Sequence, residues 1–77
     1  MSFAIELYYH GPENVVREKL LVEQITGLGG KLDFRELTGS TGEAICLTFE
    51  FEDREAANKA ANILRSRMEH VEGPYEY

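Results

Sequence analysis

The sequence has 77 residues, which is enough for one small domain, and its formal net charge is −6, from 8 Lys+Arg and 14 Asp+Glu. Hydrophobic residues make up 43% and charged residues 29%, a balance typical of a folded domain and too apolar for a disordered chain. The acidic excess argues against nucleic acid or an anionic membrane as a partner, because both attract clustered lysine and arginine. We expect residues 1–77 to form a single domain.

The cellular setting follows from the cysteine count and from the hydrophobic pattern. No apolar run approaches the roughly 20 residues that cross a bilayer, and the first six residues lack the basic start of a signal peptide. The single cysteine, Cys46, excludes an internal disulfide and a multi-cysteine metal site. We therefore expect a cytoplasmic protein with a reduced thiol, no membrane segment, no metal and no cofactor.

Residues 3–9 alternate in polarity, which predicts a half-buried β-strand whose inward residues are Phe3, Ile5, Leu7 and Tyr9. Gly11 and Pro12 end this strand. Pro12 suits the first position of a helix, where its missing N–H needs no partner, and we expect the helix to run to about Thr26.

The apolar arc of this first helix contains Val15, Leu21, Val22, Ile25 and Leu28. Glu18 falls within the same arc. We expect Glu18 to lie at the border of the arc and to reach solvent or a base on the second helix, as long charged side chains usually do. The alternative is a carboxylate that points into a site between the helices.

A second strand is predicted over residues 31–37, with Leu32 and Phe34 inward and with Lys31, Asp33 and Arg35 outward. A turn at residues 39–42 leads to the clearest strand, residues 43–52. Its inward residues are Ile45, Leu47, Phe49 and Phe51.

Asp53 is a suitable N-cap for a second helix over residues 54–68. The apolar stripe of this helix contains Ala57, Ala60, Ala61, Leu64 and Met68. A last strand is predicted over residues 70–77, with Val71, Tyr75 and Tyr77 inward, and Pro74 confines it to a sheet edge.

The order βαββαβ predicts an α+β, ferredoxin-like fold. Its four-stranded antiparallel sheet has the order 4-1-3-2, with both helices on one face and the other face open. Matching inward with inward residues, from Thr38–Glu43 onward, predicts the pairs Phe34–Leu47, Leu32–Phe49 and Lys31–Glu50. The same rule, starting from Phe3–Tyr77, predicts the pairs Ile5–Tyr75, Tyr9–Val71 and His10–His70.

No nucleotide, phosphate, zinc-protease or hydrolase motif is present, and we predict no catalytic residue. The topology places four features at one end of the sheet: His10, the start of the first helix at Gly11 to Asn14, the turn from Thr38 to Glu43, and His70. Two imidazoles could bind a transition metal or act as acid and base near neutral pH. Because two ligands alone bind a metal weakly, we expect two rim histidines without a metal.

The open face has a centre of small side chains, namely Ala4, Ala44, Cys46 and Thr48. Such a centre allows close approach of a second sheet, a helix or a planar ligand; a plain solvated face is the alternative. A nucleophilic Cys46 would need a base, for which His10 is the nearest candidate; otherwise the thiol fills the face as a small hydrophobe. The candidate binding residues are Tyr8, His10, Asn14, Cys46, Thr48 and His70.

The acidic residues expected on the open face repel phosphate and exclude nucleic acid; they are Glu6, Asp33, Glu50, Glu72 and Glu76.

The chain resembles the ACT-type regulatory modules in length, in element order, and in the run of residues 44–51 followed by a charged helix. The short turn into a last strand at residues 70–73 is also similar. The resemblance implies a small effector bound between paired domains, near residues 10–14.

We expect a small non-catalytic binding or regulatory module that forms a homodimer, or binds a protein partner, through the open sheet face. The alternative is a small enzyme of the dimeric α+β barrel type. In such an enzyme two open faces would enclose a pocket, and His10 or His70 would serve as the acid–base group.

Overall fold

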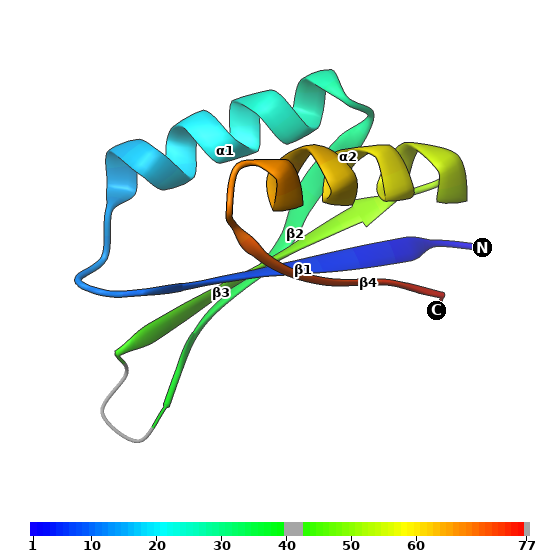
Figure 1. The fold of residues 1–77 in the computed structure, drawn as a ribbon. Helices are drawn as coiled ribbons and strands as arrows, with labels where there is room; N and C mark the ends of the chain where they lie inside the picture. The colour runs from blue at the N-terminus through cyan, green and yellow to red at the C-terminus, as the bar shows by residue number, and fades with distance from the viewer. Residues whose placement is uncertain (40–42, 77) are drawn as a thin grey trace.

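The computed structural model describes residues 1–39 and 43–76. The elements in chain order are β1 (Phe3–His10), α1 (Val15–Gly27), β2 (Gly30–Thr38), β3 (Ala44–Phe51), α2 (Arg54–Ser66) and β4 (His70–Glu76). The strands form one antiparallel sheet in the order β2-β3-β1-β4, which is the predicted order read from the other edge. The predicted α+β class and βαββαβ order are confirmed. Both helices lie on the same side of the twisted sheet (Figure 1).

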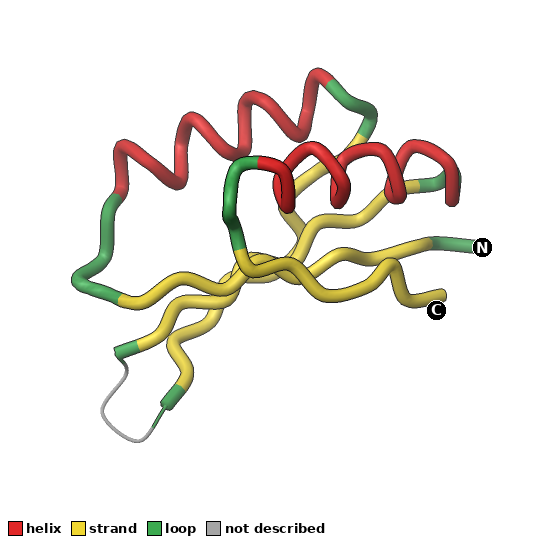
Figure 2. Tube along the Cα trace, in the orientation of Figure 1, coloured by secondary structure: helices red, strands yellow, loops and turns green. Residues whose placement is uncertain are grey.

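The core lies between the sheet and the helices. Alternate residues of β1 and β3 supply its centre, and Ile5, Leu7, Leu47 and Phe49 are fully buried. The helices add Leu21, Ile25, Ala57, Ala60, Ala61 and Leu64. The inward faces of β1 and β3 are therefore those that the period-two pattern predicts, and no helix of the described residues lies on the opposite face of the sheet (Figure 2).

The helix ends differ from the prediction in two places. The first helix begins at Val15 and not at Pro12: Asn14 precedes it with an extended backbone, and the side-chain Oδ1 of Asn14 accepts the N–H of Arg17 at 3.0 Å. Asp53 caps α2 as predicted, accepting the N–H of Ala56 at 3.3 Å. However, α2 ends at Ser66, so Met68 lies beyond the helix and is 92% exposed instead of buried. No helix in the described residues is long and apolar enough to span a membrane.

An irregularity in β2 changes the face of several residues. The predicted pairs Lys31–Glu50 and Leu32–Phe49 are confirmed, but the register shifts between Leu32 and Phe34. Phe34 therefore lies opposite Thr48 on the open face, and the predicted pair Phe34–Leu47 is wrong. After the shift Arg35 faces the helices, where the carboxylates of Glu13 and Glu18 bind its guanidinium group.

A second irregularity, between Ala4 and Glu6 on the β1 side, changes β4 in the same way. Gly73 lies there with φ of +101°, and a Cβ on it would come within 2.7 Å of the carbonyl oxygen of Ala4. As a result Tyr75 lies opposite Ala4 on the open face, instead of inward opposite Ile5. Val71 is buried as predicted, but opposite Leu7.

The predicted pairing of His10 with His70 is also wrong. His70 lies opposite Tyr8, and His10 lies opposite Ala44 on the other neighbouring strand. Phe3 lies opposite Glu76, which is thereby on the helical side, where its carboxylate pairs with Arg54. The predicted turn at residues 39–42 and the pair Phe3–Tyr77 involve residues 40–42 and 77, which lie outside the described part of the chain.

Glu18 does not lie at the border of the helix arc. It is 8% exposed, accepts a hydrogen bond from the Tyr9 hydroxyl, and binds Arg35, with Nε to Oε1 at 2.6 Å. Its basic partner therefore comes from β2 and not from α2, because the β2 irregularity turns Arg35 toward α1. This carboxylate joins three elements of the fold.

Candidate functional site

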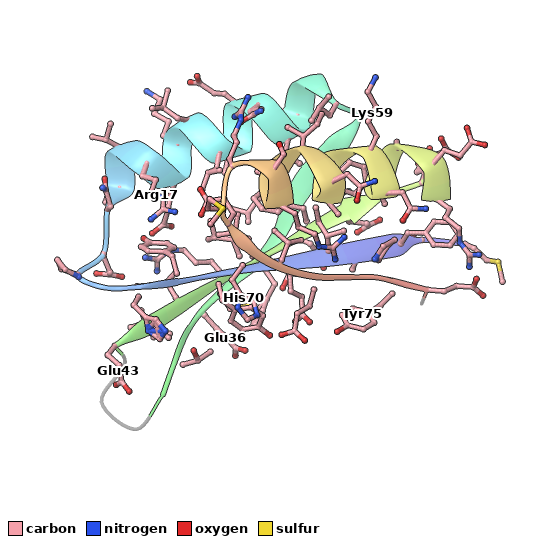
Figure 3. The ribbon with its side chains drawn as sticks, in the orientation of Figure 1. Arg17, Glu36, Glu43, Lys59, His70 and Tyr75 are labelled. Atoms are coloured by element: carbon pink, nitrogen blue, oxygen red, sulfur yellow. The ribbon has the colours of Figure 1, made fainter. Side chains whose placement is uncertain are left out.

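The open face of the sheet is the surface on which the predicted candidate residues converge. We define it as the alternate residues of β1 and β3 that point away from the core, together with the residues paired with them on β2 and β4: Ala4, Glu6, Tyr8, His10, Lys31, Phe34, Glu36, Thr38, Ala44, Cys46, Thr48, Glu50, His70, Glu72 and Tyr75. Figure 3 shows Glu36, His70 and Tyr75 on this side of the sheet, while Arg17 and Lys59 lie on the helical side.

The strand registers arrange these residues in rows that cross the sheet from β4 to β2. The first row is His70, Tyr8, Cys46 and Glu36. The second is Glu72, Glu6, Thr48 and Phe34, and the third is Tyr75, Ala4, Glu50 and Lys31. In these rows the middle strands contribute half-buried or buried residues, and the edge strands contribute exposed ones. The rim of the face is therefore more exposed than its centre.

The first row brings together three predicted candidates. The rings of Tyr8 and His70 meet edge to face, with centroids 5.5 Å apart. Burial raises the pKa of the Tyr8 phenol, and Cys46, Glu6 and Glu72 add to that effect, so the hydroxyl stays protonated. His70 is also within 3.6 Å of Glu72, with Nε2 facing Oε2, which becomes an ion pair when the imidazole is protonated.

Cys46 lies on the open face, as predicted, but its neighbours cover it. It is 2% exposed, and its Sγ is 4.0 Å from Oε2 of Glu6 and 3.9 Å from Oγ1 of Thr48. Burial raises the pKa of the thiol, with the nearby carboxylates of Glu6 and Glu36 acting in the same direction. A neutral, covered thiol is a poor nucleophile, so the arrangement favours packing over covalent chemistry.

The second row sets two carboxylates against each other. Glu6 and Glu72 lie directly opposite across β1 and β4, where like charges destabilise a sheet. They also lie one row from Tyr75, whose pKa is raised by desolvation and then by Glu72 and Glu6. This part of the face is therefore acidic and aromatic together.

The two remaining candidates lie outside these three rows. His10 is exposed at the end of β1, opposite Ala44 of the open face, and is not opposite His70. Asn14 caps α1, and its backbone N–H donates to the Tyr9 hydroxyl oxygen at 3.0 Å. These contacts give Asn14 a structural role at the helix start.

Three residues of the face were missed in the sequence: Phe34 and Tyr75 were expected inward, and Glu36 was not singled out. The first two change sides at the irregularities of the edge strands. Gly73 next to Pro74 was the one local signal for such an irregularity in β4.

Other parts of the molecule offer less. An open hollow of about 390 Å³ lies at the far end of the sheet, lined by Gly29, Gly30, Lys31, Glu50, Phe51, Glu52, Asp53 and Ala56. It contains none of the six candidate residues. In residues 1–39 and 43–76, no group of three or more His, Cys, Asp or Glu side chains is placed to hold a metal ion.

In comparisons with known proteins, no family model and no curated protein matches the sequence. Function therefore has to be inferred from the open face itself.

Proposed function

We propose that this protein is a small non-catalytic interaction module whose open sheet face binds another protein surface. The observation that carries this proposal is the contrast between rim and centre. Phe34 and Tyr75, on the two edge strands, are 55% and 48% exposed, whereas Ala4 and Cys46 between them are 7% and 2% exposed. Exposed aromatic side chains around a centre of short ones favour contact with a second surface.

NMR mapping on the ¹⁵N-labelled protein tests this proposal. Spectra would be recorded on dilution from near-millimolar to low micromolar concentration, and on titration with short peptides of basic, acidic and neutral composition. We expect the amides that shift to lie in the open-face rows, and in β1 and β4 in particular. Shifts confined to α1 and α2, or no shift under any condition, would refute the module.

Self-association is a second candidate, and the rows favour it in one respect. A two-fold axis along the strands, between β1 and β3, would place β4 of one copy over β2 of the other. His70 would then lie over Glu36 of the second copy, and Tyr75 over Lys31. Sedimentation velocity tests this homodimer directly, because a strict monomer at high micromolar concentration removes it.

An enzyme of the dimeric α+β barrel type is the remaining alternative. In its favour, Tyr8, Cys46 and His70 share one row and would line a pocket between two copies. Against it, burial raises the pKa of both the thiol and the phenol, which favours their protonated forms, and His10 lies one row away from them, opposite Ala44. Turnover that is lost in His70→Ala while dimerisation persists would establish this alternative.

The resemblance to ACT-type modules adds a small effector near residues 10–14 to the proposal, and the single free thiol supports a cytoplasmic setting as part of it. The backbone and side chain of Asn14 are engaged at the helix start, so an effector would contact the exposed His10 side. Shifts in the amides of residues 10–14 on addition of amino acids would support it.

A further inference from the structure

We infer that the partner of the open face is a protein surface that presents lysine and arginine, and not a second copy of this chain. The inference rests on the proposed function, because it takes the open face to be the binding surface. It is carried by where the charges of the molecule lie.

The basic residues are segregated from the open face. Of the 8 Lys+Arg, Lys31 alone belongs to it. Arg35 turns to Glu18 on the helical side, and the other six lie on or directly after the helices: Arg17, Lys19, Arg54, Lys59, Arg65 and Arg67. The open face carries four carboxylates against that one lysine, namely Glu6, Glu36, Glu50 and Glu72.

These carboxylates are poorly balanced within the chain. Lys31 lies opposite Glu50 at the end of the face. Among the residues described, no lysine or arginine pairs with Glu6 or Glu72, which oppose each other in the second row. A cationic group from a partner would relieve this repulsion. The resulting electrostatic stabilisation would therefore favour the complex over the free protein.

The aromatic residues of the face suit the same partner. Tyr75 and Tyr8 flank the two carboxylates, one row to each side, and Phe34 ends their row. Aromatic rings attract ammonium and guanidinium groups and also cover the methylene stems of lysine and arginine. A lysine or arginine side chain of a partner could therefore contact the carboxylates with its charged group and the aromatic rings with its methylene groups at the same place.

A second copy fits less well. The two-fold arrangement described above would bring Glu6 and Glu72 of both copies into the same row, with no lysine or arginine among them. Charge complementarity therefore favours a basic surface over an identical acidic one.

The test uses the intact protein and three peptides of equal length, in which valine alternates with lysine, glutamate or glutamine. We expect the lysine peptide alone to bind, with shifts centred on the second row, and binding to weaken at high salt. The combined variant Glu6→Gln/Glu72→Gln should bind about three- to tenfold more weakly, given the usual strength of exposed charge contacts. Glu23→Gln, which removes one exposed carboxylate from α1, should bind as the wild type does.

Urea denaturation checks that the double variant is folded; its midpoint should be no lower than that of the wild type, since two opposed charges are removed. Equal weakening by Glu23→Gln, or binding of the neutral peptide with the same affinity, overturns the inference. A dimer that buries the open face, without binding of the lysine peptide, also overturns it but leaves the proposed function standing. Absence of any effect on the open face overturns both.

Discussion

The guanidinium group of Arg35 donates from Nε to Oε1 of Glu18 at 2.6 Å and thereby joins edge strand β2 to the buried side of α1. The Tyr9 hydroxyl donates to the same carboxylate from β1. The outer side of Arg35 binds Glu13 at 2.6 Å. Arg35 thus pairs with one carboxylate inside the fold, that of Glu18, and with one at its surface, that of Glu13.

We predict that Arg35→Leu lowers the urea midpoint more than Arg54→Leu does. Loss of the Arg35 guanidinium leaves the Glu18 carboxylate without its cationic partner. The Glu18 side chain is 11% exposed, and an unpaired buried charge is strongly destabilising. Arg54 and Glu76 are 61% and 43% exposed, so their pair contributes less than about 1 kcal/mol. Equal midpoints for the two variants would show that water solvates Glu18 adequately.

The pH dependence of stability offers a second prediction. The hydrogen bond from Arg35, and then that from Tyr9, lowers the pKa of Glu18 against the opposing effect of burial. The folded state therefore favours the ionised form. The contribution of Glu18 to stability is complete above the unfolded pKa of about 4.3 and is lost as the pH falls through the lower folded value.

Glu18→Gln should accordingly be less stable than the wild type at neutral pH and should lose less stability on acidification below about pH 4. Urea midpoints measured across that range test the sign. Glu23→Gln is the control, because it removes an exposed carboxylate of the same helix and should follow the wild-type curve. Parallel curves for wild type and Glu18→Gln would contradict the prediction.

Strand order and the inward faces of β1 and β3 could be predicted because these central strands alternate strictly from Phe3 to Tyr9 and from Ile45 to Phe51. The edge strands could not be predicted to the same depth. Each has one neighbour only, so an irregularity at Leu32–Phe34 or at Gly73 disturbs a single ladder. Those two shifts account for the errors at Phe34, Arg35 and Tyr75.

The site was predictable to the extent that it lies on the central strands. Tyr8, Cys46 and Thr48 are on the open face as parity requires. His10 and His70 were paired wrongly because their register depended on counting back from the chain end through the irregularity at Gly73. The role of Glu18 could not be predicted because it depends on Arg35. Strict alternation along β2 assigned Arg35 to the open face, whereas the irregularity places it on the helical side.

Cys46 should react slowly with a thiol reagent in the native monomer, although it is on the open face. Its side chain is covered by open-face neighbours, and burial raises the pKa of the thiol, so little thiolate is available. Labelling in strong urea gives the intrinsic rate for comparison. We expect Tyr8→Ala to speed native labelling, because Tyr8 lies opposite Cys46; an unchanged rate would mean that other residues provide the cover.

Phe49→Ala should be the most damaging change in the sheet. Phe49 is fully buried at the middle of β3, between Ile5 and Leu32 on the neighbouring strands, and truncation there costs about 3–5 kcal/mol. Thr48→Ala, one residue away on the open face, should cost less than about 1 kcal/mol. Chemical denaturation of both variants tests the assignment of faces, which similar losses at the two positions would contradict.

The last prediction concerns the backbone at Gly73, which turns Tyr75 to the open face. Its φ of +101° is a conformation that side chains disfavour, and a Cβ there would lie 2.7 Å from the carbonyl oxygen of Ala4. Gly73→Ala should therefore destabilise the protein by about 1–3 kcal/mol or shift the β4 register. Gly27→Ala is the matched control: a Cβ at Gly27, the last residue of α1, meets nothing within 4 Å, and the change should be neutral or stabilising by up to about 1 kcal/mol. Denaturation measures both effects, and NMR contacts between Ala4 and Tyr75 report the register. If Gly73→Ala keeps these contacts and wild-type stability, the strain at this position is absent, and the irregularity that places Tyr75 on the open face has another cause.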